Sequence, residues 1–463
     1  MSVPTRQVRD LPAPPRSYWR LVGPGIVTSG LALGSGEFVL WPFIVSQVGL
    51  VLLWGALVGV VTQFFINMEV ERYTLATGET ALTGFNRFWR HWGLVFVILA
   101  CFGNLWPGWA LTAATLSTFL FGGSPTTIAI IMLLVIGAAL TLAPVIYVAL
   151  ERLMFVKVAA VVTLVVLALT VAIEDATWRQ LPTGILGFGT IPAGLGIALV
   201  FGAISFSGTG GAINLCQSNW IRDKGFGMGR YVPRLVSPVT GQEEAERTVT
   251  SYVFETTVPN MTRWMSWWRF ANVEQLFSFV LVTLATIGIT SMLAHSTLFG
   301  VTGLPNEVSI LRLEAQALEI SVGRWFAVLF LAVGAFSLFG AAMGIIDVTS
   351  RLAADIIKST YLPRSAISES RLYFWLVWGI VALGCAILLS GAQQPITLLV
   401  ISACTAGTMM FIYSILLIAL NRSKLPAAIR INGFRIAVLG WATILYGSLA
   451  AMTIYTQVPA LFR

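Results

Sequence analysis

The chain has 463 residues, of which 57% are hydrophobic and only 10% are charged, and its mean hydropathy is +0.84. Soluble domains carry about 25% charged residues, so this composition excludes a soluble protein and predicts a polytopic α-helical membrane protein. The formal net charge of +8 does not indicate nucleic-acid binding, because an excess of Lys and Arg in membrane proteins usually reflects their cytoplasmic loops.

Eleven stretches are apolar and long enough to cross a bilayer, which takes about 20 residues. In chain order they are 21–48, 50–72, 93–121, 126–146, 152–173, 190–221, 272–296, 323–349, 371–391, 394–421 and 432–456. The sequence therefore predicts about eleven transmembrane helices.

The first stretch contains Gly34-Ser35-Gly36-Glu37 near its middle. Glycine weakens a helix by about 1 kcal/mol relative to alanine, and a charge at the bilayer centre costs at least roughly 2.5 kcal/mol. Small residues also allow close helix packing in membranes, but two glycines beside an acid exceed what packing needs. We interpret this run as an unwound segment whose free backbone groups face a substrate.

The distribution of basic residues predicts the orientation. With a cytoplasmic N-terminus, every inside segment is basic, and the inside charges include the pair Arg152 and Lys157 beside the fifth stretch. The short outside loops at 48–50 and 122–125 carry no charge. The positive-inside rule then places the N-terminus in the cytoplasm and the C-terminus outside, in a multi-pass protein of the plasma (inner) membrane.

A second interruption, Ser207-Gly208-Thr209-Gly210-Gly211, lies in the sixth stretch. Five stretches beginning with a broken helix are thus followed by five more that begin in the same way. Because five is odd, the second half enters the membrane from the opposite side, which predicts an inverted repeat. The expected organisation is a tail at 1–20, a first repeat at 21–173, a second repeat at 190–421 with a cytoplasmic loop at 222–271, and an added helix at 432–463.

Two further patterns concern the helices around these breaks. Met261, Trp264, Met265 and Trp268 share one helical face, which predicts a helix at the membrane surface before the seventh stretch. Asp347 and Arg351 stand four residues apart in the eighth stretch, where an intramembrane ion pair is expected.

The candidate substrate-binding residues lie at the two breaks and on the helices expected beside them. They are Gly34, Ser35, Gly36, Glu37, Trp106, Ser205, Phe206, Ser207, Gly208, Thr209, Asn214 and Thr408. Glu37 is also the candidate metal ligand, although an acid in the first turn of a helix can instead cap it. Asn214 can likewise cap a helix or coordinate substrate, and Trp106 can pack in the core or form an aromatic wall with Trp109.

Several segments resemble the NRAMP family of metal-ion transporters. Gly23-Pro24-Gly25 is similar to the family's motif before its first helix, and Phe201-Gly202-Ala203 is similar to the approach to its sixth-helix break. Leu52-Leu53-Trp54 and the stretch 398–422 resemble its second and tenth helices. The resemblance runs over nearly the whole chain and implies an all-α LeuT-type fold, with a 5+5 inverted repeat, broken helices 1 and 6 and one extra C-terminal helix.

The chemistry of the site departs from the family pattern. Gly34-Ser35-Gly36-Glu37 stands where the family has Asp-Pro-Gly-Asn, and Phe206-Ser207-Gly208 stands where it has a metal-binding Met followed by Pro-His. Trp106 and Trp109 occupy the positions of its third-helix acids. Proton coupling of the family type is therefore not expected.

Two cargo classes follow from these observations. The family resemblance implies a secondary transporter of divalent metal ions by alternating access, and an oxygen-only donor set suits hard ions such as Mn²⁺ or Mg²⁺. The alternative cargo is a small organic or inorganic anion or an amino-acid-like solute, held by the amides of the unwound Gly-Ser-Gly segment. We expect no enzymatic activity and no cofactor. The expected partners are the substrate and the lipid bilayer, with no nucleic acid, and the chain can function as a monomer.

Overall fold

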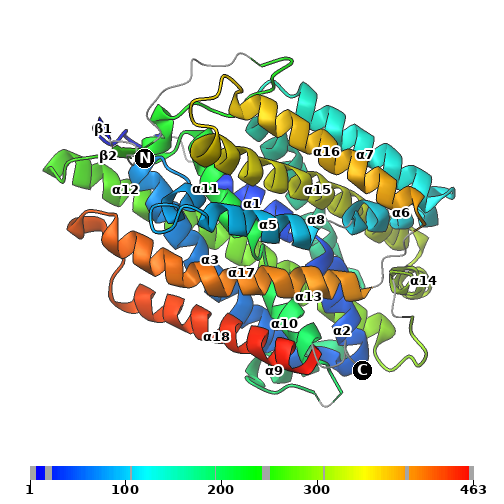
Figure 1. Cartoon of the computed structure of the whole chain (residues 1–463). Coiled ribbons are helices and arrows are strands. Elements are labelled where there is room, and N and C mark those ends of the chain that lie inside the picture. Colours follow the sequence, from blue (N-terminus) through cyan, green and yellow to red (C-terminus); the bar gives the residue numbers. More distant parts are fainter. Residues whose placement is uncertain are drawn as a thin grey trace.

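The computed structural model describes residues 7–15, 23–104, 107–192, 194–241, 251–305, 308–391 and 396–457. Almost all the secondary structure in these ranges is helical (Figure 1). They contain nine helical stretches that are long and apolar enough to cross a membrane. One of the nine, Pro24–Thr77, covers the first two predicted spans, and the predicted sixth span is divided into two shorter helices. The predicted all-α membrane fold is confirmed.

The first half of the chain contains α1 (Pro24–Ala32), α2 (Trp41–Val48), α3 (Leu53–Thr77), α4 (Ala81–Phe85), α5 (Trp92–Asn104), α6 (Gly108–Phe121), α7 (Pro125–Leu142), α8 (Ile146–Val171) and α9 (Asp175–Leu186). The second half contains α10 (Ile197–Ser205), α11 (Ala212–Lys224), α12 (Val258–Gln275), α13 (Val282–Leu298), α14 (Ile310–Ser321), α15 (Arg324–Ile356), α16 (Glu369–Leu389), α17 (Ile396–Ser423) and α18 (Gly433–Gln457). Short 3₁₀- or π-helical turns cover Gly36–Leu40, Gly49–Leu52, Gly227–Tyr231, Leu276–Leu281, Ile357–Tyr361 and Ala427–Ile429.

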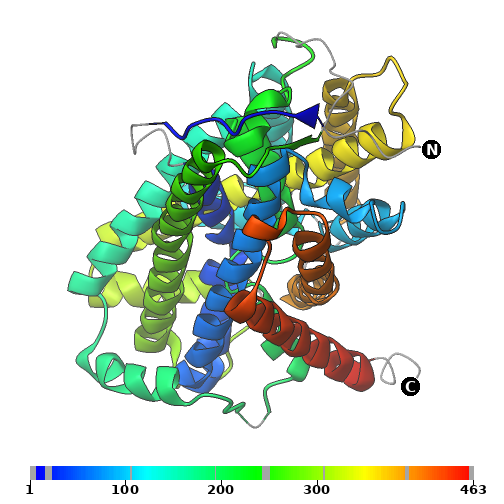
Figure 2. The same ribbon diagram turned by 90° about the vertical axis from the view of Figure 1, so that its left-hand side faces the viewer.

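The long helices run between two ends of the molecule (Figure 1). The end that carries β1 (Gln7–Val8), β2 (Tyr252–Val253) and the start of α12 is called the N-face below. The opposite end, with α9 and α14, is called the C-face. The last helix, α18, lies at the edge of the bundle and packs on α17 and α10 (Figures 1 and 2).

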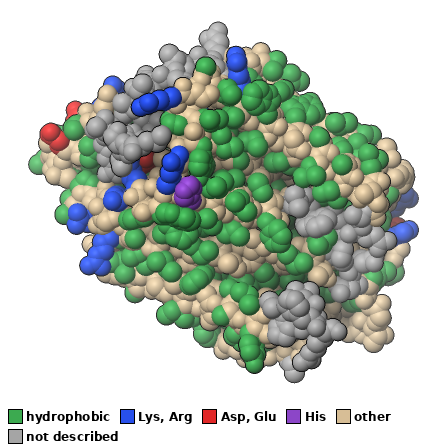
Figure 3. Space-filling model, viewed as in Figure 1, with side chains coloured by type: hydrophobic (Ala, Val, Ile, Leu, Met, Phe, Trp, Pro, Cys, Tyr) green, Lys and Arg blue, Asp and Glu red, His purple; other side chains and the backbone are tan. Residues whose placement is uncertain are grey.

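The surface between the two faces is apolar. Hydrophobic side chains cover the middle of the molecule, and most Lys and Arg side chains in this view gather near its two ends (Figure 3). Large apolar side chains that point outward include Phe102, Leu134, Phe155 and Ile444. A continuous apolar surface of this kind is costly in water and suits the hydrocarbon core of a bilayer.

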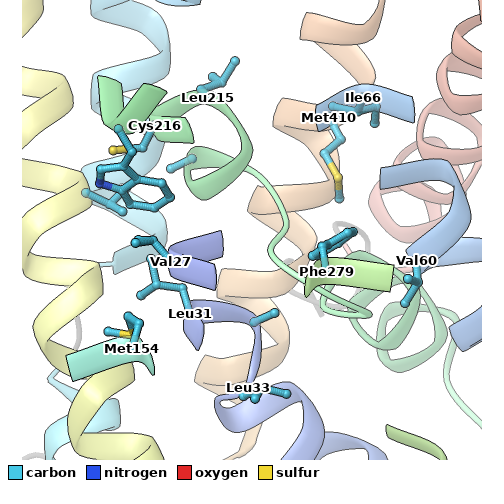
Figure 4. Close-up of a cluster of buried hydrophobic side chains, with 14 of the residues drawn as sticks. Val27, Leu31, Leu33, Val60, Ile66, Met154, Leu215, Cys216, Phe279 and Met410 are labelled. Carbon is cyan, nitrogen blue, oxygen red and sulfur yellow. The ribbon is translucent and has the colours of Figure 1, made fainter. Parts of the chain in front are cut away.

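The core of the bundle is built around α1. Val27 and Leu31 of α1 face Met154 of α8, and Leu215 of α11 lies nearby (Figure 4). The approach of α1 to α8 is close, because a Cβ atom at Gly30 would lie 2.7 Å from Cβ of Met154. A larger residue at this position would therefore separate the two helices.

The N-terminal segment is attached to α12. β1 and β2 pair in parallel, with Gln7 opposite Tyr252. The backbone N–H of Leu11 donates to Oδ1 of Asn260 at 3.1 Å, and Nε1 of Trp267 donates to the carbonyl of Pro12 at 2.7 Å. These bonds join the described part of the predicted tail to the first three turns of α12.

α1 is also attached to α12, through its own N-terminus. Oε1 of Glu274 accepts the backbone N–H of Gly25 at 2.9 Å and that of Gly23 at 3.4 Å. The first backbone N–H groups of a helix lack partners within it, so a carboxylate from α12 satisfies them here.

The helix predicted at 261–270 is present as part of α12, and its place at the membrane surface stays a prediction. α12 begins at Val258 and continues through a π-helical turn into α13, so that one helical stretch runs from Val258 to Leu298. Trp264 is buried and stacks on Trp268, over which the guanidinium groups of Arg72 and Arg435 lie at 4.0 and 4.7 Å. Cation–π contacts therefore hold Trp268 against α3 and α18.

Glu314 of α14 is a buried carboxyl group near the C-face. Neither of its oxygens has a hydrogen-bond partner among the described residues. Burial raises the pKa of Glu314 from 4.5 to about 8, because the charged form loses its hydration. The folded state therefore holds this proton more tightly than the unfolded state does. Its contribution to the free energy of unfolding is complete below about pH 4.5 and is lost as the pH rises to about 8.

We expect Glu314→Gln to remove this pH dependence, because an amide is never ionised. Between about pH 5 and about pH 9 the melting temperature of the wild type should fall more than that of the variant. Differential scanning fluorimetry in detergent measures both curves. Glu319→Gln, on the exposed side of the same helix, is the matched control and should follow the wild type. Parallel curves for wild type and Glu314→Gln would contradict the assignment.

Candidate substrate-binding site

The first predicted break is present between α1 and α2. Helix α1 ends at Ala32, and a π-helical turn starts at Gly36. The N–H of Gly34 donates to Oε2 of Glu37 at 3.0 Å, and the hydroxyl of Ser337 on α15 donates to the carbonyl of Leu33 at 2.5 Å. Side chains thus satisfy backbone groups that the interruption would otherwise leave without partners inside a membrane.

The second break separates α10 from α11. Gly208, Gly210 and Gly211 have positive φ angles of 113°, 62° and 54°, which side-chain-bearing residues rarely adopt. The backbone therefore leaves the right-handed helical conformation at the point where a helix would otherwise continue. The glycine run in 207–211 is the feature from which this break was predicted.

Gln63 of α3 holds the second break in place. Its Nε2 donates to the carbonyl of Ser205 at 3.0 Å, and its Oε1 accepts the N–H of Gly210 at 2.9 Å and the hydroxyl of Thr209 at 3.3 Å. The sequence analysis did not identify Gln63. The feature of the sequence that could have identified Gln63 is a side-chain amide inside the apolar stretch 50–72. A second side-chain amide, Asn67, follows it four residues later.

The two breaks touch one another. A Cβ atom at Gly36 would lie 2.6 Å from the carbonyl oxygen of Phe206, so only glycine allows this approach. At Gly59 of α3 a Cβ atom would lie 2.6 Å from the carbonyl oxygen of Ile204. The prediction that the scaffold places the breaks against each other is confirmed.

A cavity opens where the breaks meet. Its empty volume is about 560 Å³, including the space at its mouth, and it is lined by backbone of both breaks together with Trp109, Phe206 and Met409. Trp109 and Phe206 face each other with ring centroids 6.0 Å apart. A second cavity shares Ser35 and Trp109 with the first and continues past Val308 and the start of α17, toward the C-face.

The structure divides the predicted site residues into two groups. The residues that line the first cavity are Gly34, Ser35, Gly36, Phe206, Gly208 and Thr209. The residues that do not line it are Glu37, Ser205, Ser207, Asn214 and Thr408. Trp106 lies outside the described residues. Further residues that line it include Asn104, Ser402 and Met409, together with Trp109, which the sequence analysis named as part of an aromatic wall.

Three of the residues that do not line the cavity form side-chain hydrogen bonds with other protein groups. Asn214 donates to Asn67 at 2.6 Å and accepts from the hydroxyl of Tyr413 at 3.0 Å. Ser207 donates to the carbonyl of Ala203, and Thr408 to that of Cys404. Asn214 therefore has the interhelical role that the sequence left open.

Glu37 is fully buried behind the cavity wall. One carboxylate oxygen accepts from Gly34, and the other, Oε1, has no hydrogen-bond partner among the described residues. Within those residues no group of three or more His, Cys, Asp or Glu side chains could hold a metal ion. The Glu37 carboxylate thus binds the backbone of the first break and does not line the cavity.

The N-face side of the site is closed by buried ion pairs. Arg351 of α15 pairs with Asp347 at 2.9 Å, as predicted, and also with Asp223 of α11. Asp347 accepts further bonds from Tyr373 at 2.7 Å and Trp220 at 3.2 Å. These bonds tie α11, α15 and α16 together between the cavity and the N-face.

No family model matches the chain, and no curated protein does. Solved structures of a manganese transporter from Eremococcus coleocola are similar to it. For two variants of that transporter the TM-scores are 0.70 and 0.71, with 13% and 12% identity, and the matches cover 99% of this chain and 91% of theirs. A complex of that transporter with an aromatic bis-isothiourea substituted compound has a TM-score of 0.65 at 12% identity.

This likeness shows the fold over nearly the full chain. The protein is an all-α membrane protein of the LeuT type, with the architecture that its resemblance to the NRAMP family predicts. At 12–13% identity the likeness shows the fold alone.

Proposed function

We propose that the chain is a secondary transporter that moves a small, net-neutral, polar organic solute, such as an amino-acid-like molecule, by alternating access. The observation that carries the cargo class is the lining of the two cavities, which includes no charged side chain among the described residues. An ion in such a site would lose its hydration without gaining a counter-charge, which costs several kcal/mol. A neutral solute avoids this penalty.

The elements for binding such a solute are present. The exposed backbone around the two breaks offers amides and carbonyls, and Ser35, Thr209 and Asn104 add polar side chains. The rings of Trp109 and Phe206 supply an apolar wall. Interrupted half-helices that meet near the middle of a bundle are typical of substrate sites in secondary transporters.

The proposed orientation follows from the basic residues and places the N-face in the cytoplasm. In that orientation the cavity faces outward and the ion pairs of Arg351 close the cytoplasmic side. Transport then requires these pairs to separate while the opening toward the C-face closes.

A second candidate cargo is a divalent metal ion, which the likeness to a manganese transporter favours. The free Oε1 of Glu37 and the thioether of Met409 would be its donors. This cargo requires the Glu37 carboxylate to turn toward the cavity. One carboxylate is weak compensation for a doubly charged ion.

The test is uptake by liposomes that contain the purified protein. The panel contains neutral amino acids and small neutral polar solutes, with Mn²⁺, Mg²⁺ and Ca²⁺ and small carboxylates beside them. Saturable uptake of a neutral solute supports the proposal. Saturable metal uptake that is lost in Glu37→Gln would support the second candidate, and uptake no faster than in protein-free liposomes would reject both.

We expect Trp109→Ala to reduce uptake of the neutral solute by about tenfold, mainly through a higher KM, because the apolar wall of the cavity is lost. Uptake measured over a range of solute concentrations separates KM from the maximal rate. Trp325→Ala, at an exposed tryptophan on the C-face end of α15, is the control and should leave both values unchanged. An unchanged KM in Trp109→Ala would place the solute elsewhere.

A further inference from the structure

Lys157 is a buried cation at the centre of the bundle. The sequence analysis counted it with the inside charges, but it lies eleven residues into α8 and none of its surface is exposed. At 1.5 Å per residue this is about 17 Å from the start of the helix, near the middle of a hydrocarbon core of about 30 Å. Its Nζ has no hydrogen-bond partner among the described residues.

The side chain of Lys157 approaches the first break through α15. A Cβ atom at Gly340 would lie 2.9 Å from Cδ and 3.7 Å from Nζ of Lys157. The next residue, Ala341, lies 3.3 Å from the corresponding position on Gly34, whose N–H binds Glu37. A short chain of contacts therefore connects the ammonium group with the carboxylate.

Lys157 and Glu37 are both ionisable side chains of the bundle interior, and both are fully buried. They form no direct ion pair, and each retains a polar atom without a partner among the described residues.

The carboxylates on the helices around Lys157 are already paired with other cations among the described residues. On α15, Asp347 binds Arg351, which also binds Asp223 of α11. On α8 itself, Glu151 binds Lys224 at 2.6 Å. The described part of α1 has no charged residue. Among the described residues of these helices, Lys157 is thus the buried cationic side chain without an ion pair, and it is the candidate to compensate Glu37.

We propose that Lys157 is a specificity-determining residue, which neutralises Glu37 and thereby keeps divalent metal ions out of the site. This inference rests on the proposed transport function and deepens it. Without Lys157, Glu37 would be an uncompensated carboxylate beside the hydroxyls and carbonyls of the two breaks. Once turned toward the cavity, an uncompensated carboxylate among these neutral oxygen donors would attract hard divalent ions, although weakly because it is a single charge.

The variant Lys157→Met removes the charge and keeps an unbranched side chain, and we expect it to gain affinity for metal. Mn²⁺ is the probe, measured by isothermal titration and by the thermal shift it causes in purified protein. The wild type should show no saturable binding up to millimolar Mn²⁺. In Lys157→Met we expect the dissociation constant to be at least about tenfold lower than that limit.

Two further variants separate this gain from a general change of structure. Lys157→Met with Glu37→Gln lacks the carboxylate and should lose the acquired Mn²⁺ binding. Lys157→Arg keeps the charge and should behave like the wild type. Lys157→Gln provides a second neutral side chain if Lys157→Met does not fold.

The outcomes distinguish this proposal from the proposed function. Mn²⁺ binding that appears on removal of the charge and disappears with Glu37→Gln supports the role of Lys157, whichever solute is transported. Glu37-dependent Mn²⁺ binding in the wild type would overturn it. Well-folded neutral variants that bind no Mn²⁺ would also overturn it, while leaving the uptake of a neutral solute to be judged by the liposome panel.

Discussion

Replacing Gly36 by alanine is expected to reduce uptake by more than about tenfold, because the added Cβ atom would lie 2.6 Å from the carbonyl oxygen of Phe206. The obstacle is backbone of the opposite break, which cannot move aside as a flexible side chain can. The two breaks must separate, and the cavity between them changes shape. Uptake by liposomes of the solute identified in the panel measures the effect.

A control for Gly36→Ala is available in α13. Gly288 is also helical, but a Cβ atom there would meet no other atom within 4 Å. Gly288→Ala should therefore retain wild-type uptake and a wild-type melting temperature. Equal uptake by Gly36→Ala and the wild type would show that the contact between the breaks is not part of the transport mechanism.

Replacing Arg351 by methionine is expected to lower the free energy of unfolding by about 3–5 kcal/mol. Arg351 is fully buried, and its loss leaves Asp347 without a cation among the described residues, while Asp223 keeps only its longer pair with Arg222 at 3.4 Å. A carboxylate buried in the way of Asp347 then lacks both water and a counter-charge. Thermal and denaturant unfolding in detergent, monitored by tryptophan fluorescence, measure the change.

The matched control uses the other end of the same helix. Arg324 begins α15 at the C-face and is exposed, so Arg324→Met should change stability by less than about 0.5 kcal/mol. Adding Asp347→Asn to Arg351→Met should restore part of the lost stability, because the uncompensated charge is removed with its partner. A stability of Arg351→Met equal to that of the wild type would mean that the ion pairs contribute no net stability.

The positions of both breaks could be predicted from the sequence because they depend on residue types that helices and membranes disfavour. Gly34, Gly36 and Glu37 stand together inside an apolar stretch, and all five residues from Ser207 to Gly211 are Ser, Gly or Thr in a run that no helix favours. Backbone conformation follows directly from such local chemistry. The ion pair of Asp347 with Arg351 was predictable for a similar reason, since its partners lie one helical turn apart.

The roles of Gln63 and Lys157 could not be predicted in the same way. A stretch that is hydrophobic on all sides has no periodicity that shows which side of the helix faces the site. Gln63 forms hydrogen bonds with residues more than 140 positions away in the chain. Lys157 was counted with the inside charges because basic residues usually lie at the ends of spans. Only the packing of α3 and α8 against the breaks identifies these side chains.

The bonds of α12 also have a mechanical consequence. Because α12 holds the segment of Leu11 and Pro12 as well as the N-terminus of α1, a displacement of α12 is passed directly to α1. We therefore expect α1 and α12 to move together. A swing of α1 alone would break the bonds of Gly23 and Gly25 with Glu274, whereas rotation of α1 with α12 would leave them intact.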